Sequence, residues 1–133
     1  MIIDYDINNL KKRQKTDFLI DGKAEYWAIY DFSYKYRTRI FNSVSEEVAY
    51  VEKDIYTEDK VNLFDHKGNR IDEIIKTSEG YRSDKYLYSG DIDKGEIRDL
   101  FLNDEGKITV NDENNALLAI MFIAGLVEIS RKD

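Results

Sequence analysis

ALLAIMFIAGLV, residues 116–127, is a run of twelve apolar residues in a chain in which 35% of residues are charged. Asn111-Asp112-Glu113-Asn114 precedes it and Arg131-Lys132 follows it, which is the polarity that a helix dipole favours. At 3.6 residues per turn the apolar side chains cover every face, so this helix needs walls on all sides. At about 1.5 Å per residue the run of twelve is about 18 Å long, too short for a bilayer of about 30 Å. It therefore predicts a central buried helix over residues 113–129.

Length and composition predict one domain over residues 1–133, because no proline-rich or low-complexity linker interrupts the chain. The net charge of −7 argues against nucleic acid as a partner, since the average field repels phosphates. The absence of cysteine excludes disulfides and thiolate metal sites. The N-terminal residues lack the pattern of a signal peptide, and we expect a cytoplasmic protein without a transmembrane segment.

The segments before the helix change from polar to alternating. Residues 4–16 are polar and include a basic cluster at 11–15, so we expect residues 1–16 to be loosely ordered, as a loop or a short helix. From Asp17 onward, apolar and polar residues alternate with a period of two, which is typical of strands with one packed face.

A shift of 23 residues aligns three segments of the chain, 14–36, 37–59 and 60–82. The shift superposes Phe18, Phe41 and Phe64, and each segment reads as strand, turn, strand. A last hairpin is expected between 97 and 110, before the helix. The fold class that follows is mainly β (α+β by count), an antiparallel β-barrel of short hairpins wrapped around one buried hydrophobic C-terminal helix. We also expect a strand or an aromatic ring close to Gly125, because glycine is costly inside a helix.

The segments 32–35, 39–42, 47–53 and 62–71, together with the apolar helix, resemble the LURP-one-related, tubby C-terminal-like superfamily. The resemblance covers about residues 26–76 and 113–129. It implies an antiparallel barrel threaded by a hydrophobic helix, and it implies a relation to tubby proteins, which bind phosphoinositides, and to phospholipid scramblases. The chain departs from the family pattern at Ser43-Val44-Ser45-Glu46, which replaces a glycine-containing turn, and in a shortened first unit.

One strand carries a basic stripe with a defined geometry. Lys35, Arg37 and Arg39 alternate along it, and Lys60 is the equivalent of Arg37 at the 23-residue shift. Such a stripe can hold a phosphate or an anionic lipid headgroup. The alternative is that these cations pair across strands with Glu46, Glu47 or Glu52.

The sequence supplies no catalytic constellation, so we expect a non-enzymatic protein without a cofactor. His66 is the single histidine and lies in a predicted turn, and no phosphate-binding, dinucleotide-binding or hydrolase motif occurs. Residues 91–96 depart from a calcium loop in the position of the glycine, and no metal site is predicted. We expect a small tubby-like domain that binds an anionic lipid headgroup or a protein. The alternative is an acidic inhibitor or adaptor that docks on a basic surface through Asp91, Asp93, Glu96, Asp99, Asp104 and Glu105.

Overall fold

The structure is a computed structural model that describes residues 1–34, 36–78, 80–84, 87–89, 95–97, 100–102, 107–110 and 116–130. As predicted, the chain is mainly antiparallel β-structure with one apolar C-terminal helix. The helices are α1 (Ile7–Lys11) and α2 (Ala116–Ser130). The strands are β1 (Ile2–Asp4), β2 (Thr16–Ile20), β3 (Lys23–Asp31), β4 (Arg37–Asn42), β5 (Glu47–Lys53), β6 (Lys60–Asp65), β7 (Arg70–Lys76), β8 (Gly80–Arg82), β9 (Leu87–Ser89), β10 (Gly95–Ile97), β11 (Leu100–Leu102) and β12 (Lys107–Val110).

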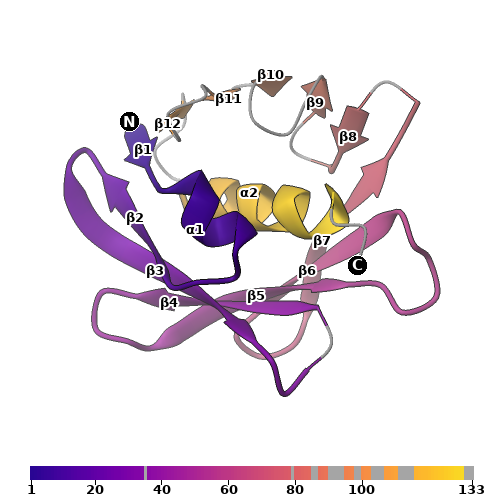
Figure 1. Cartoon of the computed structure of the whole chain (residues 1–133), viewed down its shortest axis with the longest axis horizontal. Helices are drawn as coiled ribbons and strands as arrows, with labels where there is room; N and C mark the ends of the chain where they lie inside the picture. Colours follow the sequence, from indigo (N-terminus) through magenta and orange to yellow (C-terminus); the bar gives the residue numbers. More distant parts are fainter. Residues whose placement is uncertain are drawn as a thin grey trace.

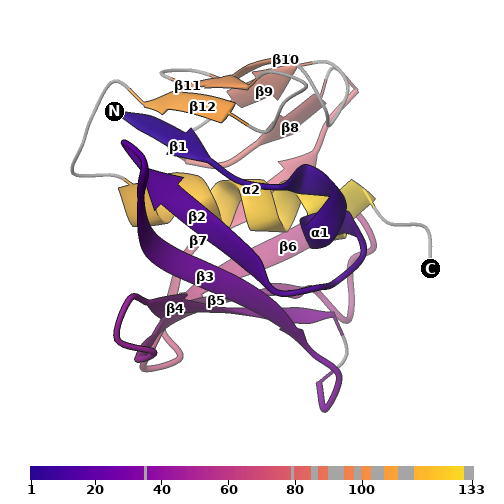
Figure 2. The ribbon, with the colours of Figure 1, turned by 60° about the vertical axis from the view of Figure 1, so that its left-hand side comes forward.

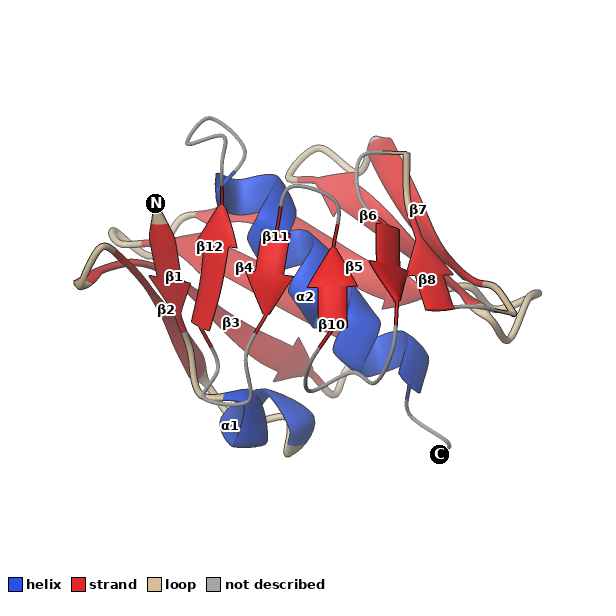
Figure 3. Cartoon of the chain, turned by 90° about the horizontal axis from the view of Figure 1, so that it is seen from above, coloured by secondary structure: helices blue, strands red, loops and turns tan. Residues whose placement is uncertain are grey.

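Each strand from β2 to β11 pairs antiparallel with the next strand in the sequence. β1 pairs with both β2 and β12, so the succession of paired strands returns to its start. Figures 1 and 2 show α2 running between the long strands β2–β7 and a second layer that contains β1 and β8–β12. Seen from above in Figure 3, α2 crosses obliquely beneath that second layer.

The three predicted hairpins, β2–β3, β4–β5 and β6–β7, repeat one register. Each residue pair in β6–β7 has a counterpart in β4–β5 whose two residue numbers are lower by 23. The register shift between Ile40 and Phe41 is repeated between Leu63 and Phe64. The pairs that face the core are Thr16–Ala28, Thr38–Val51, Val61–Ile74, Phe18–Tyr26, Ile40–Ala49 and Leu63–Asp72. The turns repeat as well, because Asn42 and Asp65 each bind two backbone N–H groups with one side-chain oxygen.

The predicted equivalence of the three phenylalanines is correct for Phe41 and Phe64 and wrong for Phe18. On the first strand the spacing to the next hairpin is 22 residues, so Phe18 is the counterpart of Ile40. Side chains alternate between the faces of a strand, and a shift of one residue therefore turns Phe18 into the core. The stacked ring pairs are Tyr5–Phe18, Trp27–Phe41 and Tyr50–Phe64, with centroids 5.4, 4.2 and 4.8 Å apart.

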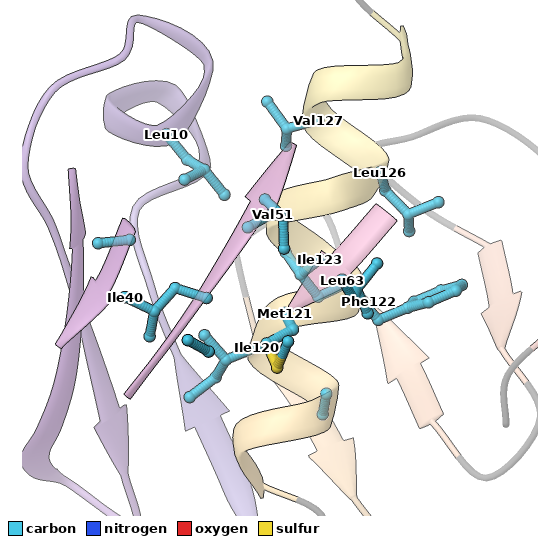
Figure 4. Close-up of a cluster of buried hydrophobic side chains, with 14 of the residues drawn as sticks. Leu10, Ile40, Val51, Leu63, Ile120, Met121, Phe122, Ile123, Leu126 and Val127 are labelled. Carbon is cyan, nitrogen blue, oxygen red and sulfur yellow. The ribbon is translucent and has the colours of Figure 1, made fainter. Parts of the chain in front are cut away.

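Helix α2 is the most buried element among the described residues. Every residue from Ala119 to Ile129 is buried, and Figure 4 shows its side chains packed among those of the strands and of Leu10. Gly125 lies against β6 and β7, as we expected, because a Cβ atom there would be 2.4 Å from Ile74 Cδ1 and 3.4 Å from Val61 Cγ1. Residues 113–115 of the predicted helix lie outside the described residues.

The N-terminal segment, which we expected to be loosely ordered, forms β1 and α1 and contributes to the core. Asp6 caps α1 by accepting bonds from two backbone N–H groups, and Leu10 on this short helix is buried. Arg13 follows α1 with its guanidinium 3.8 Å from the buried carboxylate of Glu128 on α2. Its guanidinium also lies over the ring of Tyr30, 4.3 Å from the centroid. This segment is therefore tied to the end of α2.

Candidate functional site

The predicted basic stripe lies on the outer face of β4, and its two arginines are covered by acidic and aromatic side chains. Arg37 pairs with Glu52, with Nη2 and Oε2 2.6 Å apart, and its guanidinium lies between the rings of Tyr34 and Tyr50. The side chain of Arg37 is only 16% exposed. A charge that is paired and stacked in this way has little capacity left for a ligand.

Arg39 is held from both neighbouring strands. Its Nε donates to Asp31 over 2.6 Å, and its Nη1 lies 3.0 Å from both oxygens of Glu47. Burial lowers the pKa of Arg39, but the hydrogen bond with Asp31 and the charge of Glu47 outweigh this and raise it overall. The contacts are thus those of cross-strand pairing, with Asp31 as a partner that the sequence analysis did not include.

Lys60 on β6 repeats this arrangement, as the 23-residue shift indicates. Its Nζ lies 2.9 Å from Glu73 and 3.8 Å from Asp54. Lys35, the fourth residue of the predicted site, lies outside the described residues. The three predicted cations that the structure describes are therefore all balanced by carboxylates.

Of the six residues in the acidic docking alternative, the structure describes Glu96. Glu96 belongs to β10, where it pairs with Phe101 of β11 and Ser89 of β9. The other residues of that set lie outside the described residues: Asp91, Asp93, Asp99, Asp104 and Glu105.

A different group of residues gathers where α2 ends, in the β3–β4 and β5–β6 loops. These loops lie at the same end of the molecule, because Arg37 pairs with Glu52 and the Lys53 N–H donates to the Tyr36 carbonyl over 3.2 Å. Large apolar or aromatic side chains project from both loops. They are Phe32 (78% exposed), Tyr34 (48%), Ile55 (72%) and Tyr56 (91%).

An aspartate fixes the conformation of each of these loops. Asp31 accepts a 2.9 Å bond from the Ser33 N–H, and Asp54 accepts a 2.8 Å bond from the Tyr56 N–H. The hydrogen bond from Arg39 is the main cause that lowers the pKa of Asp31, and the Tyr56 N–H is the main cause that lowers the pKa of Asp54. These hydrogen bonds favour the ionised form of both carboxylates, which is the form that accepts bonds from the loop backbone.

A cleft of about 790 Å³ adjoins the β5–β6 loop and extends to the last turn of α2. Tyr36 and Tyr81 are half-buried in its wall, and Ile129 of α2 contributes a buried side chain. Lys53 and Lys76 supply positive charge, and Glu58 and Asp59 supply exposed negative charge from the loop. The wall of the cleft thus combines aromatic and apolar side chains with charged groups of both signs, an arrangement that can bind a ligand or a partner.

The sequence contained one signal for this site. Asp31-Phe32 and Asp54-Ile55 occupy the same place in successive hairpins, and each puts a large apolar residue directly after a turn-forming aspartate. Among the described residues, no group of three or more potential ligands could hold a metal ion. Neither described helix has the length and apolar character needed to cross a membrane.

Comparisons with known proteins identify no relative of the chain. No protein-family model matches it, and neither a curated protein nor a solved structure does.

Proposed function

We propose that the chain is a small, non-enzymatic, cytoplasmic binding domain, and that it binds a protein partner at the end of the molecule where α2 ends. The scaffold in this proposal is a closed antiparallel barrel of tubby-like, LURP-one-related type. The paired succession of strands and the buried α2 support such a scaffold. The observation that carries the function is the cleft beside the β5–β6 loop, where Tyr56 is 91% exposed.

The physical reason is the cost of exposing such side chains in water. Clustered and exposed large apolar groups mark interaction surfaces more often than isolated ones do. Tyrosine in particular combines a large apolar ring with a polar hydroxyl and is enriched at the centres of protein interfaces. Hydrogen bonds from the Tyr56 and Thr57 N–H groups to the Asp54 carboxylate hold the loop in place, so little conformational entropy is lost when a partner binds.

A protein partner fits these features better than an anionic lipid headgroup does. The described cations of the basic stripe are engaged by Asp31, Glu47, Glu52 and Glu73. The net charge of −7 also opposes approach to an anionic bilayer. The non-enzymatic part of the proposal is supported by the roles of the ionised Asp31 and Asp54, which hold loop backbone in place.

Site-specific photo-crosslinking in the cells that make the protein tests the proposal. A photoreactive residue at Tyr56 is expected to give a discrete protein adduct. The matched control is the same residue at Val44, which is 70% exposed on the turn at the opposite end of β4 and β5. The proposal fails if position 56 gives no adduct, or if positions 56 and 44 give the same adducts.

A further inference from the structure

The surface around Tyr56 combines a projection and a hollow on one end of the molecule. Ile55 and Tyr56 project from the β5–β6 loop with 72% and 91% of their surfaces exposed. The cleft of about 790 Å³ begins directly beside them and has Tyr36, Tyr81 and Ile129 in its wall. A single surface of this chain therefore carries a projecting anchor and a hollow, lined in part by aromatic and apolar side chains, that could receive one.

The projection is held in a fixed shape by the carboxylate of Asp54. One oxygen accepts bonds from the backbone N–H groups of Tyr56 and Thr57, at 2.8 and 3.2 Å. The other accepts a 3.2 Å bond from the side-chain amide of Asn62 on β6, and the Asp54 N–H donates to the carbonyl of Lys60 over 2.9 Å. A preorganised anchor of this kind loses little entropy on docking.

The charges around the cleft have both signs. Glu58 and Asp59 are exposed on the loop that carries the projection. Lys53 and Lys76 border the hollow, with the ammonium group of Lys53 5.2 Å from the centroid of the Tyr36 ring. Because these four side chains line the same cleft, the surface carries both signs, and a two-fold rotation can place its carboxylates against the lysines of a second surface of the same composition.

We propose that the partner at this surface is a second copy of the same chain, docked end to end about a two-fold axis. Tyr56 of each copy enters the cleft of the other, and Glu58 and Asp59 of each copy face Lys53 and Lys76 of the other. Because projection and hollow lie on the same end, the contact closes into a dimer and does not continue as a filament. This inference rests on the proposed function and names the partner.

The size of the surface sets the expected strength. Two loops and a cleft make an interface at the small end of the specific range, for which we expect a dissociation constant on the order of 10 µM. Sedimentation analysis of the purified full chain should show a monomer–dimer equilibrium near that concentration. A chain that stays monomeric up to about 1 mM would overturn the inference.

Three serine substitutions locate the interface. Tyr56→Ser and Ile55→Ser should each raise the dissociation constant at least about tenfold. Val44→Ser is the matched control, because Val44 is 70% exposed and Ile55 72%, on turns at opposite ends of β5. A dimer that is weakened equally by Val44→Ser, or left unchanged by Tyr56→Ser, would contradict the inference. All three side chains are exposed, so folding is not expected to change.

A charge exchange tests the facing groups. Lys76→Glu and Glu58→Lys should each weaken self-association at least about tenfold, while an equal mixture of the two variants should form a heterodimer. If the mixture associates no more tightly than each variant alone, the facing arrangement is refuted. The two proposals can also be told apart. If the chain is monomeric but position 56 still crosslinks another protein, only the inference of a second copy fails. If the chain is monomeric and position 56 gives no adduct, both proposals fail.

Discussion

Substituting Gly125 by alanine tests how closely α2 is packed against the strands. A Cβ atom at this position would lie 2.4 Å from Ile74 Cδ1, whereas carbon atoms in contact are separated by about 3.5–4.0 Å. Ile74 is completely buried, so its side chain must leave its present position. Overpacking of this kind costs about 1–3 kcal/mol, and the higher helix propensity of alanine returns about 1 kcal/mol. We therefore expect Gly125→Ala to lower the free energy of unfolding by up to about 2 kcal/mol.

The clash can be isolated by removing the single atom that causes it. Ile74→Val deletes Cδ1 and alone should cost about 0.5–1.5 kcal/mol. In that background the remaining contact, 3.4 Å to Val61 Cγ1, requires only a small adjustment. Gly125→Ala should then be neutral or stabilising, which corresponds to a coupling free energy of about 1–3 kcal/mol between the two sites.

Urea unfolding followed by circular dichroism measures all four members of this cycle. Ile75→Val is the matched control, because Ile75 is the next residue of β7, is half-buried and loses the same methyl group. The cost of Gly125→Ala should be the same in the Ile75→Val background as in the natural chain. A cost that persists in the Ile74→Val background, with a coupling below about 0.5 kcal/mol, would refute the packing argument.

Three further predictions concern the turns and the outer face. Ser45 has a φ of 62° where its counterpart Gly68 has 85°. Ser45→Gly should therefore stabilise the chain by about 0.5–1 kcal/mol in urea unfolding, and Gly68→Ser should destabilise it. A destabilising Ser45→Gly together with a stabilising Gly68→Ser would contradict the equivalence of the two turns. Arg37→Glu places two carboxylates together beside Tyr34 and Tyr50 and should lower the free energy of unfolding by about 1–3 kcal/mol. Adding Glu52→Arg should restore part of this stability. An unchanged free energy of unfolding in Arg37→Glu would show that the pair of Arg37 and Glu52 does not stabilise the chain. The pKa of Asp65 is lowered mainly by the hydrogen bond from the Asn69 N–H. The ionised Asp65 therefore contributes its full stabilisation when the pH is above the ordinary pKa of 3.8, and this stabilisation is lost as the pH falls below that value. Asp65→Asn should therefore reduce the fall in stability between pH 5 and pH 2, measured by urea unfolding, and an unchanged fall would exclude Asp65 as a cause.

The sequence predicted the elements whose patterns are local. The apolar run 116–127 identifies α2 because no other element of that length can be buried on every side. Alternation and the 23-residue shift identify the hairpins, whose registers follow from side-chain faces and turns. The error at Phe18 arose because a single-residue change of spacing leaves the apolar pattern almost unaltered and still reverses the face.

Other features depend on contacts between distant segments. β1 is a three-residue strand, too short for alternation to identify, and its place is set by pairing with both β2 and β12. The contacts of the Arg37 guanidinium with the rings of Tyr34 and Tyr50 could not be predicted either, because they join a loop and two strands. The cleft could not be read from the sequence, since its wall combines residues from β7, β8, α2 and two loops.

Hydrogen exchange of the backbone amides of α2 tests the central claim most directly. Helix α2 is buried from Ala119 to Ile129 and contributes Ile129 to the cleft, so in this account α2 does not open without the strands. We expect the amides of residues 120–129 to exchange only by global unfolding, as slowly as those of β5 and β6. Exchange of α2 through a local opening, while β5 and β6 stay protected, would show a detachable helix and contradict this structure of the core.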